Sequence, residues 1–136
     1  MELSNFSRSR EGTIVYEAKI AVVDKDPLSR EFVVNVMMYS INREVMSFED
    51  GEAFEAYMRA GGTVHIVLSE IHLPGKSGLD LFHWVKKESP QTSFIAMSPN
   101  PADETAAEEA GVDAFLAKPF ALQDLFDIVK NFVVGE

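Results

Sequence analysis

Residues 64–81 read VHIVLSEIHLPGKSGLDL, and this stretch decides the fold. It begins with an apolar run from Val64 to Leu68, which predicts a strand that is covered on both faces. The carboxylate of Glu70 follows, and after it come a Leu73-Pro74-Gly75 turn and a helical pattern that begins at Gly78. A buried strand, a turn and a helix in this order are typical of one βα unit in a parallel sheet.

The same alternation of strand and helix patterns continues outward from this stretch. Short apolar runs predict strands at Lys19–Val23, Arg43–Phe48, Val64–Ser69, Ser93–Met97 and Ala114–Ala117. Helical periodicity, with capping residues and glycines at the ends, predicts helices at Pro27–Tyr39, Gly51–Ala60, Gly78–Glu88, Ala102–Ala110 and Leu122–Val133. In the last helix, apolar residues from Leu122 onward recur every three or four positions and predict an inward stripe. Together these patterns predict a doubly wound α/β fold with a parallel sheet.

Composition and charge exclude several classes of function. The 136 residues fit one domain, with 46% apolar and 25% charged residues, as in an ordinary globular protein. The balance of 12 Lys and Arg against 22 Asp and Glu gives a net charge of −10, which repels phosphate backbones and anionic lipid surfaces. No apolar stretch approaches the roughly 20 residues that span a bilayer. We therefore expect no direct nucleic-acid partner, no membrane association and a cytoplasmic location.

The Cys and His content limits the reactions and metal sites that are possible, and the composition of the N-terminal residues predicts where the folded domain begins. The chain has no Cys, which excludes disulfides, thiolate catalysis and cysteine-based zinc sites. His65, His72 and His83 follow no metal-site spacing, so we expect them on the surface or in loops. Residues 1–18 contain few apolar side chains and predict a flexible N-terminal arm, which leaves residues 19–136 as the folded domain.

Polar side chains follow four of the five predicted strands. They are Asp24, Lys25 and Asp26 after the first strand, Glu70 after the third, Ser98 after the fourth and Lys118 after the fifth. An isolated acid after a strand is commonly a helix cap or a solvated loop residue. However, the carboxyl ends of parallel strands meet at one edge of the sheet, where ligands bind. Four strand ends with polar residues therefore predict one shared site.

From Lys19 to Val133, including the Lys118-Pro119-Phe120 turn, the chain resembles the receiver domains of response regulators in two-component signalling. The resemblance implies the flavodoxin-like receiver fold, with five parallel strands in the order 2-1-3-4-5 and five flanking helices. In that family, two adjacent acids after the first strand hold a magnesium ion. An aspartate after the third strand accepts a phosphoryl group, whose oxygens are contacted by a Ser or Thr and a Lys.

This chain departs from the family pattern at two of these five positions. Asp24 matches the first acid, Ser98 the hydroxyl and Lys118 the lysine. Lys25 replaces the second acid, and Glu70 replaces the acceptor aspartate. The resemblance therefore implies a degenerate phosphorylation site, a pseudo-receiver that is not an enzyme.

Charge predicts the consequence of the two departures. Asp24 and Glu70 carry two negative charges and Lys25 and Lys118 two positive ones, so the site can be neutral without a metal. An ammonium about 4 Å from a magnesium ion repels it by several kcal/mol even at an effective dielectric constant of about 20. We therefore expect weak or no magnesium binding, no other cofactor and no phosphorylation of Glu70. Two interpretations of Glu70 stay open: an inert site, or a mimic of the phosphorylated state within reach of Ser98 and Lys118.

Two other functions stay open as alternatives. If Asp26 turned inward beside Asp24, it would restore a weak metal site and a conventional phosphorylation-dependent switch, whereas as a helix N-cap it would face outward. Asp24-Lys25-Asp26 also resembles the D-x-D signature of haloacid-dehalogenase-like phosphatases, with Asp24 as nucleophile and Asp26 as general acid and base. That enzyme family needs a later acidic pair at a strand end, but Asp124 and Asp127 fall within a predicted helix.

The resemblance also implies where a protein partner would bind. In receiver domains this face is formed by the fourth helix, the fifth strand and the fifth helix, here Pro101–Ala110, Phe115 and the exposed side of Leu122–Val133. Ser98 and Phe115 would form the coupling pair that moves when the site is occupied. The fourth helix is rich in Ala and Glu, which favours a partner with a basic surface. We expect a monomer or a weak homodimer.

Overall fold

Five parallel strands form the centre of the molecule, in the order β3-β2-β4-β5-β6. They are β2 (Lys19–Val23), β3 (Glu44–Phe48), β4 (Ile66–Glu70), β5 (Ser93–Ser98) and β6 (Ala114–Ala117). The structure is a computed structural model that describes residues 13–14, 18–41 and 44–135. Numbered by their appearance in the chain, the five strands follow the order 2-1-3-4-5, so the predicted topology is confirmed.

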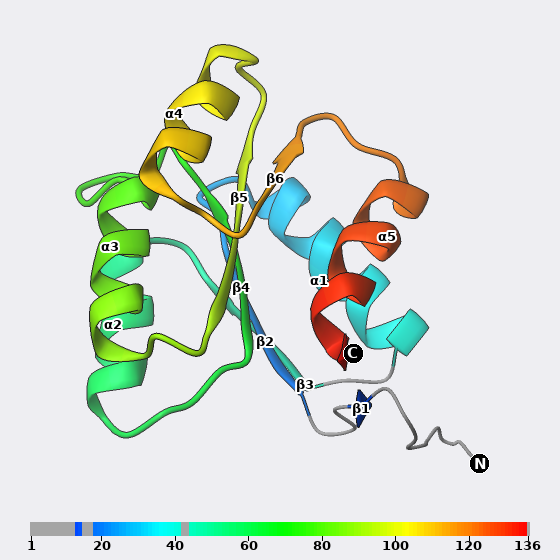
Figure 1. Cartoon of the computed structure of the whole chain (residues 1–136), viewed down its shortest axis with the longest axis horizontal. Helices are drawn as coiled ribbons and strands as arrows, with labels where there is room; N and C mark the ends of the chain where they lie inside the picture. Colours follow the sequence, from blue (N-terminus) through cyan, green and yellow to red (C-terminus); the bar gives the residue numbers. More distant parts are fainter. Residues whose placement is uncertain (1–12, 15–17, 42–43, 136) are drawn as a thin grey trace.

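Five helices cover the two faces of this sheet. They are α1 (Pro27–Ile41), α2 (Gly51–Arg59), α3 (Gly78–Glu88), α4 (Ala102–Ala110) and α5 (Leu122–Val133). Figure 1 views the sheet along its edge, with α1 and α5 on one side and α2, α3 and α4 on the other. Each side has its own apolar core, and this is the two-layer cover that a parallel sheet requires.

The central strand β4 explains why residues 64–81 decide the fold. All five of its residues are buried. Leu68 packs in the core beneath α1 and α5, whereas its neighbour Val67 packs in the core beneath α2 and α3. Successive side chains of a strand point to opposite faces, so a continuous apolar run is what a strand between two helical layers needs.

The elements occur in the predicted order, but several of their ends differ from the prediction. Strand β4 begins at Ile66 and extends to Glu70, and β5 extends to Ser98, one residue beyond each predicted end. Helix α1 continues to Ile41, and α2 ends one residue early at Arg59. Because Glu70 and Ser98 pair with neighbouring strands, both backbones lie on the rigid ladder of the sheet instead of in the loops that follow.

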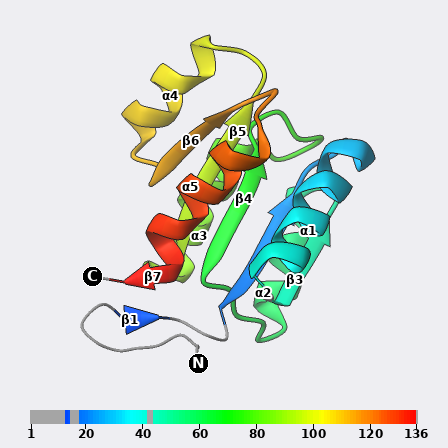
Figure 2. The same cartoon turned by 90° about the vertical axis from the view of Figure 1, so that its right-hand side faces the viewer.

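The described ends of the chain pair with each other outside the main sheet. Strand β1 (Thr13–Ile14) lies antiparallel to β7 (Val134–Gly135), and Figure 2 shows the two together near the N-terminal end of β2. Most of the predicted flexible arm, residues 1–12 and 15–17, falls outside the described residues. Within the described part of the chain, no helix combines the length and the apolar character needed to cross a membrane.

The apolar stripe of α5 is only partly buried. Leu125 and Val129 are buried against the sheet, as predicted for this stripe. Leu122 was predicted to face inward as well, but 46% of it is exposed. It is the first residue of α5 and precedes the turns that pack on the sheet. The prediction for Leu122 is therefore wrong, and an exposed apolar side chain begins this helix.

Close packing at Gly78 leads to a stability prediction. Gly78 begins α3, and a Cβ atom there would lie 2.2 Å from the backbone oxygen of Glu70 and 2.7 Å from Cα of Ile71. Neither backbone atom can move without displacing the end of β4. We expect Gly78→Ala to lower the free energy of unfolding by about 3 kcal/mol, measured by chemical denaturation.

Gly51→Ala is the matched control, because Gly51 begins α2 in the same way. A Cβ atom at Gly51 would meet no atom closer than 3.7 Å, which is an ordinary contact. We expect this variant to keep its stability to within about 1 kcal/mol, since alanine also favours the helix. Equal losses in the two alanine variants would contradict the close-packing explanation.

Candidate functional site

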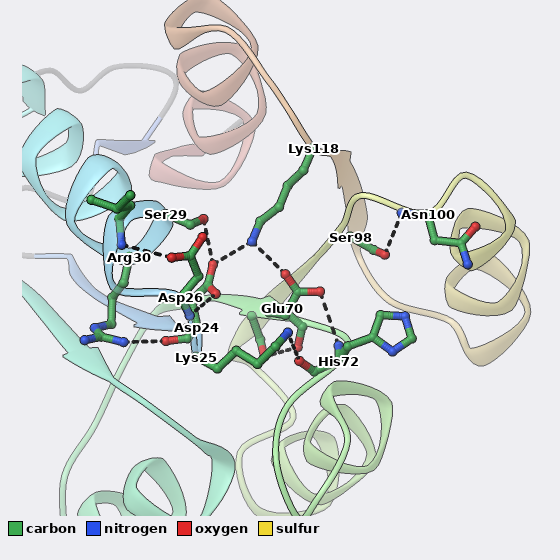
Figure 3. Close-up of polar contacts among 12 residues, drawn as sticks. Asp24, Lys25, Asp26, Ser29, Arg30, Glu70, His72, Ser98, Asn100 and Lys118 are labelled. Atoms are coloured by element: carbon green, nitrogen blue, oxygen red, sulfur yellow. Dashed lines mark hydrogen bonds and ion pairs between the residues drawn. The ribbon is translucent and has the colours of Figure 1, made fainter.

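Two buried carboxylates and one ammonium meet at the carboxyl edge of the sheet. Asp24 follows β2, Glu70 ends β4, and both are buried. Lys118 follows β6, and its Nζ donates to Asp24 Oδ2 at 2.7 Å and to Glu70 Oε1 at 2.6 Å. Figure 3 shows both carboxylates converging on this ammonium. Three of the predicted site residues, from three different strand ends, thus form one ion cluster.

The remaining oxygens of the two carboxylates are also bound. Asp24 Oδ1 accepts from the backbone N–H of Asp26 at 3.0 Å, and Oδ2 also accepts from the Ser29 hydroxyl at 2.8 Å. Glu70 Oε2 accepts from the backbone N–H of His72 at 3.3 Å. Buried charges persist only where they are paired and hydrogen-bonded. In this cluster every carboxylate oxygen has a donor.

The ammonium of Lys118 is held in its charged form. Burial opposes the charge, since only 14% of the side chain is exposed. The hydrogen bonds and the negative charges of Asp24 and Glu70 outweigh that effect, so the pKa of Lys118 is raised above the ordinary lysine value. At neutral pH Lys118 therefore supplies a full positive charge between the two carboxyl groups.

The raised pKa of Lys118 predicts how stability responds to alkali. A group whose pKa is higher in the folded state contributes stability below its unfolded pKa, about 10.4 for lysine, and loses it as the pH rises through the folded value. We expect the free energy of unfolding of the wild type to fall in that range. Lys118→Met should show a smaller fall in the same denaturation series. Parallel falls in the two proteins would count against this assignment.

Lys25 lies at the rim of the cluster and not inside it. The side chain is exposed, and its Nζ donates to the backbone carbonyl oxygen of His72 at 2.7 Å (Figure 3). The backbone N–H of the same His72 donates to Glu70 Oε2. Among the interactions of the described residues, no hydrogen bond or ion pair joins Lys25 to Asp24 or Glu70. Its charge therefore acts beside the ion cluster, on an oxygen of the loop that follows β4.

Asp26 faces solvent and caps α1. Its Oδ1 accepts from the backbone N–H of Leu28 at 3.1 Å, the interaction expected of a helix N-cap. The side chain is exposed, whereas that of Asp24 is fully buried. The inward orientation that a metal site shared by Asp24 and Asp26 would need is not adopted.

Ser98 engages α4 instead of Glu70. Its hydroxyl donates to Asp103 Oδ2 at 2.5 Å and accepts from the backbone N–H of Asn100 at 3.1 Å. The same Asp103 oxygen lies 2.6 Å from Nε2 of His72. In the described part of the chain no hydrogen bond joins Ser98 to Glu70, so Glu70 reaches only one of the two groups that the mimic interpretation assigned to it.

Asp103 and Ser29 were not predicted as site residues. Both lie in the first turn of a helix, where acidic and hydroxyl side chains are common for local reasons, so residue type alone did not single them out. Phe115 was predicted to form a coupling pair with Ser98. It lies on β6, is partly buried and packs against the core beneath α2, α3 and α4.

Comparisons with known proteins agree with this fold. The family model for the response regulator receiver domain matches residues 20–130. The beryllofluoride-activated receiver domain of DrrB from Thermotoga maritima superposes with a TM-score of 0.76 and 29% identity, over 85% of this chain and 97% of that one. NtrX from Brucella abortus superposes with a TM-score of 0.78 and 26% identity, over 85% of this chain and 27% of that one.

Two sequence relatives show the same relationship. The probable transcriptional regulatory protein TcrX of Mycobacterium tuberculosis is 29% identical over 108 residues, 78% of this chain and 45% of that protein. The transcriptional regulator NtrC of Azospirillum brasilense is 30% identical over 116 residues, 84% of this chain and 24% of that protein. The chain thus spans less than half the length of these two relatives.

The doubly wound sheet, with its strand order and two layers of helices, gives this chain the CheY-like, flavodoxin-like α/β fold. The chain belongs to the family of response regulator receiver domains. This membership favours the receiver interpretation of Asp24-Lys25-Asp26 over the phosphatase interpretation.

Proposed function

We propose that this chain is an atypical receiver domain that acts in the cytoplasm as a protein-protein interaction module of a two-component-type pathway. In this proposal Glu70 is not phosphorylated and the domain catalyses no turnover. The observation that carries the proposal is the bridge from the Lys118 ammonium to the carboxylates of Asp24 and Glu70, at 2.7 and 2.6 Å. The groups that would handle a metal and a phosphoryl group are thus engaged with each other.

The charge count supports a site that works without a metal. Asp24 and Glu70 contribute two negative charges, Lys118 contributes one positive charge within the cluster, and Lys25 adds a second at its rim. These four charges sum to zero. A divalent cation would add two positive charges to a site that is already balanced, which is unfavourable where burial lowers the effective dielectric constant.

The residues present do not fit the magnesium ion that the family implies. Magnesium requires near-octahedral oxygen ligands and is anchored by carboxylates. The second acid of the family pair is Lys25 here, and Asp26 caps α1. Over residues 13–14, 18–41 and 44–135, no three acidic or histidine side chains are arranged to hold a metal ion. The backbone oxygen of His72, another oxygen of the type that binds hard cations, accepts from the Lys25 ammonium.

The surroundings of Glu70 support an inert acceptor position. Its Oε1 is bound by Lys118 and its Oε2 by the backbone N–H of His72. Attack on a phosphoryl donor needs a carboxylate oxygen in a near-attack position, and a displacement of about 1 Å can cost a hundredfold in rate. Glutamate is one methylene longer than aspartate. Because Ser98 binds Asp103, Glu70 reproduces one contact of a phosphorylated receiver and not both, which favours the inert site over the mimic.

The proposed partner face is α4, β6 and α5, with Phe115 at its centre and Ser98 as its coupling partner. Of the residues of α4 only Ala107 is buried, so most of this helix is available for contact. Its exposed acids are Glu104, Glu108 and Glu109. With the exposed apolar side chain of Leu122, they suit a protein partner that combines basic and apolar side chains. We propose a monomer or a weak homodimer in the absence of that partner.

Intact-mass spectrometry after incubation with acetyl phosphate and magnesium tests the proposed function. Acetyl phosphate is a small phosphoryl donor that needs no cognate kinase. We expect the mass of the protein to stay unchanged at every incubation time. A magnesium-dependent phosphoryl adduct at Glu70 or at another residue of the ion cluster would overturn the proposal in favour of the conventional switch.

A further inference from the structure

We propose that Asp103 is a latch that holds α4 against the loop after β4 and keeps the Ser98 hydroxyl away from Glu70. One carboxylate oxygen of Asp103 binds both the Ser98 hydroxyl at 2.5 Å and His72 Nε2 at 2.6 Å. These two partners come from different elements, the end of β5 and the loop after β4. Release of Asp103 would free α4 and Ser98 together. This latch goes beyond the proposed function, because it does not depend on whether Glu70 is phosphorylated.

While Asp103 accepts from the Ser98 hydroxyl, that hydroxyl has no proton left to donate to Glu70. A hydroxyl has one proton to donate, and that proton goes to Asp103. Its oxygen accepts from the backbone N–H of Asn100. The side chain of Asn100 in turn accepts from the backbone N–H of Ala102, the first residue of α4. The hydroxyl, the turn and the start of the helix therefore form one connected network.

Helix α4 has little else to hold it in place. Ala107 is its only buried residue, and its N-cap residue, Pro101, offers no side-chain hydrogen bond. A helix with so little apolar burial depends on polar contacts at its ends, and such elements open at low free-energy cost. Burial raises the pKa of Asp103, but the hydrogen bonds from Ser98 and His72 outweigh burial and lower this pKa below the ordinary value.

The latch also touches the ion cluster through His72. The His72 ring contacts Asp103, its backbone N–H binds Glu70, and its carbonyl oxygen binds Lys25. The loop that carries His72 therefore joins α4 to the carboxylate of Glu70. Of the two partners of Asp103, Ser98 is buried, whereas 56% of the His72 side chain is exposed. The His72 ring is therefore the partner that solvent or a bound protein can displace first.

Amide hydrogen exchange, resolved by residue in the full chain, tests the latch. Asp103→Asn keeps the size of the side chain but removes its charge and one of its acceptor oxygens. We expect exchange in Ala102–Ala110 to rise by about tenfold, as the loss of charge-assisted hydrogen bonds predicts. Glu104→Gln is the matched control, because it removes a charge from the same helical turn at an exposed position. We expect the control to change exchange by less than about twofold, from the helix dipole alone.

A second variant separates a latch from a general structural role. His72→Ala removes one arm of the latch, so exchange in α4 should rise in the wild-type background and should not rise further in the Asp103→Asn background. If Asp103→Asn does not fold, amide exchange in α4 of His72→Ala, compared with the wild type, still tests the latch. Unchanged exchange in α4 on either substitution, equal effects of Asp103→Asn and Glu104→Gln, or independent effects of His72 and Asp103 would overturn the proposal.

Discussion

Replacement of Lys118 by methionine is expected to lower the free energy of unfolding by about 3–5 kcal/mol at neutral pH. The reason is that Lys118 is the one ammonium bonded to both Asp24 and Glu70 among the described residues. Methionine keeps the apolar stem but leaves two buried carboxylates next to each other without a counter-charge. Chemical denaturation followed by circular dichroism measures the loss.

The comparison needs a lysine that lies outside the ion cluster. Lys87→Met is the matched control, because Lys87 is an exposed lysine near the end of α3. We expect the control to change stability by no more than about 0.5 kcal/mol. A similar small loss in both variants would show that the ion cluster does not stabilise the fold.

The double variant Lys25→Asp with Glu70→Asp is expected to gain magnesium binding and magnesium-dependent phosphorylation. It removes the ammonium beside the cluster, restores the adjacent acidic pair and shortens the acceptor side chain. Two charges about 4 Å apart interact by about 4 kcal/mol at an effective dielectric constant of 20. Lys25 is exposed, so solvent screens its charge and the gain is smaller than this unscreened interaction. We expect magnesium affinity to rise by about a hundredfold. Isothermal calorimetry measures the binding, and acetyl phosphate tests the acceptor.

Two kinds of control accompany this experiment. Each single variant should stay inactive with acetyl phosphate, since Lys25→Asp alone leaves the glutamate and Glu70→Asp alone leaves the ammonium. Lys87→Asp with Glu88→Asp makes the same chemical changes on the exposed end of α3 and should not bind magnesium. A double variant at Lys25 and Glu70 that folds but neither binds magnesium nor accepts a phosphoryl group would contradict our account of why the site is inactive.

The fold follows from the sequence because its signals are local and consistent. Continuous apolar runs such as Ile20–Val23 identify strands between two helical layers, and capping residues such as Asp26 set where helices begin. The pairing of β1 with β7 was not predicted. Strands of two residues carry no periodicity, and this pairing joins opposite ends of the chain.

The sequence predicts which strand ends carry the site residues, but it does not predict which hydrogen bonds and ion pairs these residues form. The position of Asp24, Glu70 and Lys118 at one edge follows from parallel strand topology. The directions taken by Lys25 and Ser98 do not, because a long or rotatable side chain can reach several acceptors at similar cost. Lys25 binds a backbone oxygen of the loop after β4, and Ser98 binds Asp103 on α4. Both partners are set by loop geometry that the sequence pattern does not specify.

Residue-resolved NMR titration of the wild-type protein, first with magnesium and then with beryllofluoride as a phosphoryl mimic, tests the central claim most directly. If the ion cluster replaces the metal site, no saturable shifts should occur at Asp24, Glu70, Ser98 or Lys118. Saturable shifts at these residues that spread to Phe115 and α4 would contradict the account. They would show that this receiver domain is still a metal-dependent switch despite Lys25 and Glu70.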